Sequence, residues 1–214
     1  MYQLTHFRID DHEPLHKLIK NNALWILVTT LDGTLEVNHV PVVLDVHSGN
    51  CGRLRFHLAR ANPLADWLAS SPAQVGQVVF VFRAEQAYVS PDWYGQENMV
   101  PTWNYAVAHA HGHVEVLDDD ALIGVLDDLS AAQEGRLPKA PWTTRKMDQD
   151  LYEKMRRAII GFQMPIERLE GKFKMSQNRS HEARASVIRA LSDLSSENGQ
   201  KTAATMRDLL LDGP

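Results

Sequence analysis

The sequence has one cysteine, no long apolar run and no common nucleotide-binding motif. Because Cys51 stands alone, it cannot form a disulfide within the chain or join a thiolate zinc set, which favours a reducing compartment. No apolar stretch reaches the ~20 residues that a membrane helix needs. The first residues, MYQLTHFRIDD, lack the basic-then-apolar order of a signal peptide. We therefore expect a cytoplasmic protein with no membrane segment.

Further absences disfavour several enzyme classes. The chain has no G-x-S-x-G nucleophile elbow, no P-loop and no G-x-G-x-x-G dinucleotide fingerprint. A protease, a kinase or a dinucleotide-dependent dehydrogenase is therefore not expected. The formal net charge of −5 argues against a nucleic-acid surface spread over the whole molecule and leaves room only for a local basic patch.

What the chain does have is strand patterning. Its 214 residues, 44% of them hydrophobic, suffice for one domain with a sizeable core. The Asp32-Gly33 pair predicts a tight hairpin, and Pro41 marks an edge or a bulge. The segments with strand patterns are 24–30, 35–46, 53–59, 77–90 and 104–117. Strands joined mostly by tight turns predict a mainly β fold with peripheral helices, an antiparallel barrel.

Helical patterns lie around these strands. Asp10 and Asp11 can cap a first amphipathic helix, and Asp118–Asp120 can cap another. The remaining segments are predicted as a short helix over 62–70, an amphipathic helix over 149–162, a returning strand over 164–177 and helical repeats in the last ~35 residues. We expect one domain over 1–190 and a polar, partly helical tail over 191–214.

The most distinctive segment is YVSPDWYGQENMVPTWNY, residues 88–105. Flat rings, Trp93, Trp103 and Tyr105, lie close in sequence to the polar side chains of Thr102 and Asn104. Rings supply contact area at low conformational cost and polar groups fix orientation, so the segment suits a planar ligand with polar edges. The alternative is a structural plug at the end of the barrel.

Two further motifs lie on neighbouring strands. In FHLARANP (56–63) a strand end precedes a helix start, where backbone N–H groups, His57, Arg60 and Asn62 would suit a phosphate. An ordinary Asn-Pro helix cap is the structural alternative. In VNHVP (37–41), Asn38 and His39 point to opposite faces of a strand, so one of them faces inward.

A row of histidines, His109, His111 and His113, would lie on one face of a strand. Imidazoles are good metal ligands, but same-face neighbours on one strand are ~7 Å apart and converge poorly on one ion. We therefore predict no metal site, and interpret the row as a solvated or subunit-facing polar strand.

Taken together, MYQLTHFRIDD, LWILVTT, VNHVPVVLD, FHLARANP, AYVSPDWY, VPTWNYAVAHAHG and GKFKMSQNR resemble the PaiB-type family of FMN-binding negative transcriptional regulators. The resemblance runs in unbroken order from residue 1 to about 190. It implies an FMN-binding split barrel that forms a homodimer with flavin in the cleft between subunits. It places the phosphate at FHLARANP and the isoalloxazine against VNHVP. The loop GQENM (95–99) is shorter than the family pattern and lacks its lysine.

The residues and the resemblance together nominate ten positions for cofactor binding: Asn38, His39, His57, Arg60, Asn62, Thr102, Trp103, Asn104, Lys172 and Gln177. The function expected is a flavin-linked regulator with FMN as its cofactor. The alternatives are a flavin-dependent oxidoreductase and a haem protein with His39, His57 or the histidine row as axial ligands. DNA contact could come only from Lys154–Arg157 or from 179–189, and no helix-turn-helix is evident.

Overall fold

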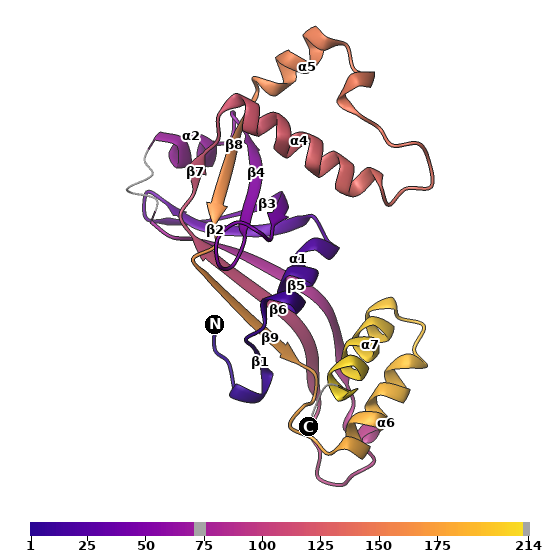
Figure 1. Cartoon of the computed structure of the whole chain (residues 1–214). Helices are drawn as coiled ribbons and strands as arrows, with labels where there is room; N and C mark the ends of the chain where they lie inside the picture. Colours follow the sequence, from indigo (N-terminus) through magenta and orange to yellow (C-terminus); the bar gives the residue numbers. More distant parts are fainter. Residues whose placement is uncertain (71–75, 212–214) are drawn as a thin grey trace. The chain divides into compact units, whose positions relative to one another are not determined.

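The computed structural model describes residues 1–70 and 76–211 (Figure 1). Nine strands join in the hydrogen-bonded order β1-β9-β6-β5-β2-β3-β4-β8-β7. The strands are β1 (Arg8–Ile9), β2 (Leu24–Leu31), β3 (Thr34–Asp45), β4 (Arg53–Ala59), β5 (Val78–Val89), β6 (Thr102–Gly112), β7 (Glu115–Val116), β8 (Ile159–Pro165) and β9 (Arg168–Lys174). The described helices are α1 (His12–Asn21), α2 (Pro63–Ser70), α4 (Asp119–Glu134), α5 (Gln149–Arg156), α6 (His181–Ser192) and α7 (Glu197–Leu211), with short 3-10 turns at Thr5–Phe7, Pro91–Tyr94 (η2) and Thr144–Lys146.

By its internal contacts the chain divides into two compact units. The first unit comprises Met1–Leu18, Phe82–Ala108 and Glu170–Pro214. The second unit comprises Ile19–Val81 and His109–Leu169. The second unit holds the larger set of paired strands, and the first contains the helical pair α6 and α7.

Antiparallel pairing organises the second unit. Asp32 and Gly33, both with positive φ, form the tight turn between β2 and β3. Residues up to Pro41 in β3 pair with β2, and from Val42 onward β3 pairs with β4. Pro41 therefore lies where the strand changes partner, which suits a residue that has no N–H to donate.

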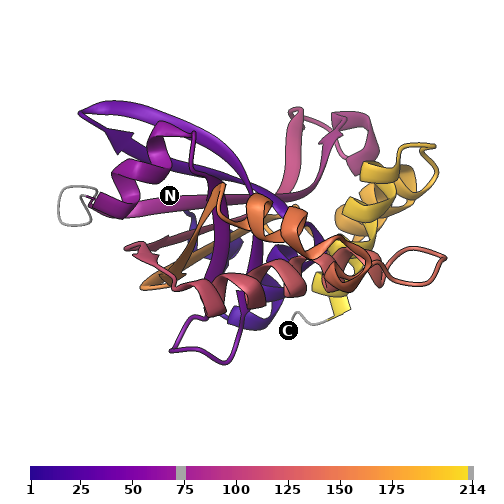
Figure 2. The same ribbon diagram turned by 90° about the horizontal axis from the view of Figure 1, so that it is seen from above.

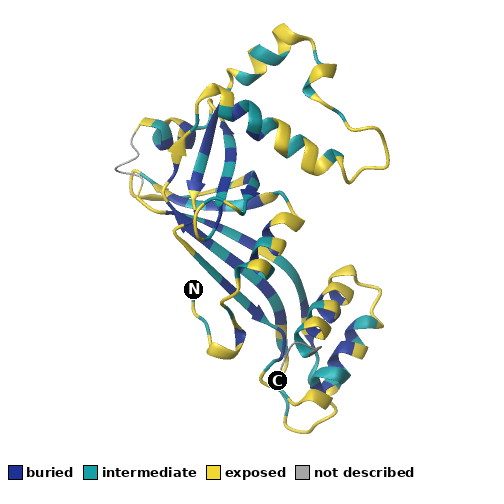
Figure 3. Ribbon diagram, in the orientation of Figure 1, coloured by how far each residue is buried: buried dark blue, intermediate teal, exposed yellow. Residues whose placement is uncertain are grey.

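The core of the second unit is aromatic. Phe56 on β4 stacks on Phe162 of β8 at 5.5 Å between ring centroids and meets Phe80 of β5 edge-on at 5.2 Å. All three rings are fully buried. Along β4, buried residues alternate with half-buried ones (Figure 3), and α4 packs across β3, β4 and β8 (Figure 2). The strand therefore has one face in the core and one face under a helix.

In the first unit, α6 and α7 lie side by side (Figures 1 and 2). Each buries an apolar stripe that includes Val187 and Leu191 on α6 and Ala203 and Met206 on α7. α6 also packs on the η2 turn. The C-terminal helices were predicted, but as surface segments, whereas part of each is core. None of the helices in residues 1–70 and 76–211 combines the length and the apolar character needed to span a membrane.

The predicted mainly antiparallel fold with peripheral helices is confirmed. The helix predicted over 149–162 is wrong in its second half, because α5 ends at Arg156 and β8 begins at Ile159. The β-branched Ile159 and Ile160 favour a strand. Gly161 fits against α4, where an added Cβ would lie 3.1 Å from Leu122 Cδ1. Tertiary packing thus overrides the helical periodicity.

Gly171 on β9 provides a test of packing in the first unit. A Cβ at this position would lie 2.2 Å from Cδ2 of Leu15, whose side chain is fully buried and has little freedom to move. We expect Gly171→Ala to lower the free energy of unfolding by about 1–3 kcal/mol.

The matched control is Gly124→Ala in α4, where a Cβ would meet nothing within 4 Å. Alanine is the better helix former, so this change should stabilise the protein by up to about 1 kcal/mol. Urea unfolding of both variants measures the difference, and equal stability of the two would contradict the packing described for Gly171.

Candidate functional site

The junction between β4 and α2 brings two of the predicted residues together. Asn62 caps α2, accepting the Leu64 N–H at its Oδ1 over 3.0 Å. Its Nδ2 donates to Oδ1 of Asn38 on β3 over 2.9 Å. The cap and the cross-strand contact fix both amide groups, so Asn38 and Asn62 form one rigid polar pair.

Arg60 lies in the same junction and is exposed. Its Nε donates to the carbonyl of Arg157 at 3.2 Å, and one terminal nitrogen lies 3.5 Å from the carbonyl of Ile159. These contacts engage two of the five guanidinium N–H donors and hold the side chain in place. The guanidinium is positively charged, and its remaining N–H donors are available for an anion.

The backbone of this junction differs from the prediction of exposed N–H groups. The N–H of Arg60 donates to Ala158, that of Asn62 to Ala59, and that of Ala65 to Asn62. The Leu64 N–H is also engaged, by the Asn62 side chain. An anion at this junction would therefore be held mainly by side chains.

The two predicted histidines lie elsewhere. Leu54, Phe56 and Leu58 point into the core, so His57 points to the opposite face of β4, beneath α4. Asn38 lies two residues before the buried Val40 on β3 and therefore points to the core side of the sheet. His57 points to the other side, so it is separated from the Asn38–Asn62 pair. His39 alternates away from Asn38 and is exposed. The prediction that one of Asn38 and His39 faces inward is therefore confirmed, with Asn38 the inward residue.

The first unit presents an aromatic surface. Tyr88 on β5 and Trp103 on β6 meet edge to face at 6.1 Å between centroids, and they are 45% and 52% exposed. With Trp93 they line a cavity of about 410 Å³ whose other wall comes from the start of α7. Half-exposed aromatic rings beside a cavity favour a flat ligand or a protein partner over a sealed plug.

Asn104, by contrast, is fully buried. Its amide nitrogen donates to Ser176 Oγ at 3.1 Å and lies 3.3 Å from Met206 Sδ, while Ser176 Oγ lies 3.2 Å from Asn104 Oδ1. Tyr94 Oη lies 3.4 Å from the same hydroxyl. The amide is thus engaged within the protein and does not face a ligand, contrary to its predicted role. Ser176 and Tyr94 were missed because their contacts join segments distant in sequence.

The other predicted residues of the first unit have local partners. Lys172 Nζ donates to the Tyr2 carbonyl at 3.2 Å and lies 5.5 Å from the centroids of the Tyr2 and Tyr105 rings. The side chain of Gln177 closes a turn, donating to the Phe173 carbonyl at 2.6 Å and accepting the Met175 N–H at 2.7 Å. Both polar groups of the Gln177 side chain thus stabilise this turn.

Thr102 is the partner of a lysine that the predicted set omitted. Lys174 Nζ donates to Thr102 Oγ1 and, at 3.0 Å, to the carbonyl of Trp103. Burial lowers the pKa of Lys174, with the nearby charges of Lys172 and Arg179 adding to the shift. This lysine fixes the backbone beside the exposed ring of Trp103 and sets a positive charge next to it.

The histidine row has protein partners in the second unit. Arg168 lies 3.1 Å from Nδ1 of His111, and Nδ1 of His113 lies 2.6 Å from Glu167. The rings of His109 and His111 are 6.3 Å apart. His111 is buried, so the interpretation of the row as solvated is wrong for this residue.

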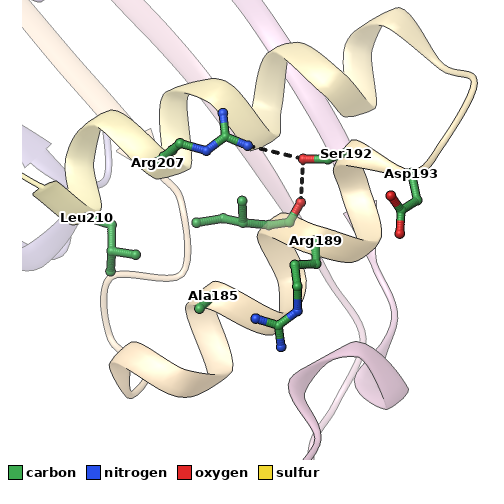
Figure 4. Close-up of a pocket in the computed structure, with 7 residues that line it drawn as sticks. Ala185, Arg189, Ser192, Asp193, Arg207 and Leu210 are labelled. Carbon is green, nitrogen blue, oxygen red and sulfur yellow. Dashed lines mark hydrogen bonds between the residues drawn. The ribbon is translucent and has the colours of Figure 1, made fainter.

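A further cavity, of about 470 Å³, lies between α6 and α7 (Figure 4). Arg207 donates to Ser192 Oγ at 3.3 Å, and that hydroxyl donates to the Ile188 carbonyl at 2.7 Å. Arg189 and Asp193 lie at the same opening. Asp193 offsets one of the two arginine charges, which leaves only a weakly positive surface.

The ten nominated residues thus fall into two sets of five. Asn38, His39, His57, Arg60 and Asn62 belong to the second unit, and Thr102, Trp103, Asn104, Lys172 and Gln177 belong to the first. Within these sets, the structure leaves Arg60 with donors to spare, Asn38 and Asn62 as a fixed pair, and Trp103 as an exposed ring. A guanidinium, an amide pair and an exposed ring have the donor chemistry that a phosphorylated planar cofactor needs.

Comparison with known proteins agrees with this chemistry. A family model described as "Putative FMN-binding domain" matches residues 1–168. "Protease synthase and sporulation protein PAI 2" of Bacillus subtilis is 28% identical over 210 residues, which cover 98% of each chain. An uncharacterized protein of Emericella nidulans is 31% identical over an alignment that covers 91% of each chain.

Among solved structures, the FAD and haem binding protein of Mycobacterium smegmatis aligns with a TM-score of 0.56 and 17% identity. The alignment covers 83% of this chain and 78% of that one. At this level of identity the likeness shows the fold alone. The predicted split-barrel fold is confirmed.

The buried Asn104 provides a test of the first unit. Asn104→Ala would leave the Ser176 hydroxyl without its main partner in a sealed environment, so we expect a loss of about 1–3 kcal/mol in the free energy of unfolding. Chemical denaturation of Asn104→Ala and of the exposed control Asn178→Ala measures the effect. If both variants were as stable as the wild type, the network would not support the fold.

Proposed function

Because this chain belongs to the FMN-binding domain family, we propose that it binds FMN as a homodimer and acts as a flavin-linked regulator. The family match over residues 1–168 is the observation that carries the proposal. The relative in Bacillus subtilis is named a sporulation protein, which supports a regulatory role over an isolated catalytic one.

The phosphate of FMN is assigned to Arg60 and the Asn38–Asn62 pair. Two carbonyl contacts position the Arg60 guanidinium and leave donors for an anion. The amide pair of the same β4–α2 junction is fixed by the α2 cap. Preorganised donors of this kind bind a phosphate without the entropic cost of ordering long side chains.

The isoalloxazine ring is assigned to Trp103, with Thr102 beside it, supplied by the partner chain of the homodimer. Trp103 is half-exposed, and Lys174 anchors its carbonyl and the Thr102 hydroxyl. A flavin, once bound, supplies reversible one- and two-electron redox chemistry. The residues named here would bind the ring, orient it and exclude water from one of its faces.

Direct reading of DNA is not part of this proposal. Of the basic residues on and next to α5, Arg156 is paired with Asp119 and Glu153 at 2.8 Å each. The net charge of −5 opposes approach to a polyanion outside a local basic patch. A regulator of this composition would act through a protein partner or a flavin-dependent change in its dimer surface.

The assignment of Arg60 predicts a difference between two flavins. One charge-assisted hydrogen bond contributes about 1.5–3 kcal/mol, so Arg60→Ala should weaken FMN binding roughly tenfold or more. It should leave riboflavin, which has no phosphate, almost unaffected. Titrations followed by flavin fluorescence measure both affinities.

The control is Arg145→Ala, which removes an exposed arginine elsewhere in the second unit. Equal loss for FMN and riboflavin in Arg60→Ala would refute the phosphate contact. The absorption spectrum of the purified protein tests the cofactor class: bands near ~370 and ~450 nm indicate flavin, and a Soret band near ~400 nm would indicate haem instead.

The homodimer predicts a mass of about 48 kDa in light scattering, twice the 24.1 kDa of the chain. If Trp103 lies at the dimer surface, Trp103→Glu should shift the equilibrium toward monomer, because a charged side chain would replace a large apolar ring and would lose its hydration there. The control, Tyr2→Glu, alters a ring that is 77% exposed. A wild-type monomer at micromolar concentration would rule out the shared site.

A further inference from the structure

A cavity of about 290 Å³ lies on the α4 side of β4, within the second unit. Its floor contains His57 from β4 and Pro41 from β3, which lie on the face of the sheet opposite the Asn38–Asn62 pair. Leu126 and Leu129 of α4 form one wall, and Trp142 closes another. The cavity is thus separate from the residues assigned to the flavin.

The walls of this cavity are held in place. Oε2 of Glu134, at the end of α4, accepts the backbone N–H of Trp142 at 2.7 Å and pairs with Lys139. Arg136 donates to the carbonyls of Lys20 at 2.7 Å and Asn21 at 3.1 Å. The chain after α4 is therefore anchored on both sides of the cavity, and the space is a built feature of the fold.

His57 is one of four polar residues that line this largely apolar space, together with Ser130, Gln133 and Glu134. Its Nδ1 is shielded from solvent and has no hydrogen-bond partner among the residues that the structure describes. The ring can therefore meet a molecule in the cavity only through Nε2. Burial lowers the pKa of His57, which keeps the imidazole neutral near pH 7. A neutral imidazole pairs with a hydroxyl whether Nε2 carries the proton or not.

We propose that this cavity is a second ligand site, which binds a small aromatic molecule bearing a hydroxyl group, with the hydroxyl on His57 Nε2 and the ring between Trp142 and the leucines of α4. The apolar lining and the indole suit a ring of one or two fused cycles. A few polar groups at fixed places in a largely apolar lining select for a matching group on the ligand. The site needs no flavin and lies outside the assignments made above.

The test compares two probes of similar shape, phenol and toluene. Phenol has a hydroxyl group where toluene has a methyl group. In the wild-type protein phenol should bind about tenfold more tightly than toluene, the size expected for one hydrogen bond. Calorimetric titration gives the affinities. The ¹H–¹⁵N correlation of the histidine rings shows whether the His57 nitrogens respond to phenol.

Two variants and one control separate the contributions. His57→Leu should abolish the preference for phenol while keeping toluene binding, and Leu129→Trp should remove binding of both probes by filling the cavity. His47→Leu changes an exposed histidine of the same unit and should behave as the wild type. If His57→Leu does not fold, the response of the wild-type His57 ring signals to phenol and the binding of phenol by Leu129→Trp still test the proposal. The proposal fails if phenol binding does not saturate, if it leaves the His57 ring signals unchanged, or if Leu129→Trp binds phenol normally.

Discussion

The alternation of side chains along β4 is the constraint on which the arrangement of the second unit depends. Leu54, Phe56 and Leu58 all point from one face of β4 into the core. Because side chains alternate along a strand, Arg55 and His57 lie on the other face. That other face requires a cover, which α4 supplies, with Arg55 paired to Asp128 at 2.6 Å. Asn38 of β3 lies on the core side of the sheet, where it contacts Asn62 at the start of α2. His57 and its cavity lie on the opposite side. The sheet therefore separates the Asn38–Asn62 pair from the histidine cavity.

Local sequence signals predicted most of the elements. The Asp-Gly turn, the aspartates that cap α1 and α4, and the Asn-Pro start of α2 each act within a few residues, so their outcome does not depend on distant parts of the chain. The segment after Arg156 shows the limit of this reasoning. Its helical periodicity is real, but pairing with β4 and the close approach of α4 to Gly161 decide its structure.

The candidate site was predictable in its residue types and less so in their roles. Arg60, Asn62 and Trp103 have free donors or an exposed ring, as their chemistry suggested. Asn104 differs because Ser176, 72 residues later, occupies its amide, and no local pattern reveals such a contact. Lys174 was missing from the predicted set for the same reason, since its partners lie on β6. Long-range polar contacts are where sequence patterns carry least information.

Ser176 has a consequence for which residues its position accepts. Its φ of 62° lies in the left-handed region, where glycine is favoured and a β-carbon is costly. Glycine would relieve the backbone but would remove the hydroxyl that Asn104 and Tyr94 share. A larger polar residue would keep a polar group but would have to fit a position that is only 3% exposed. Backbone geometry, polarity and volume together therefore restrict the residues that position 176 can accept without loss of stability.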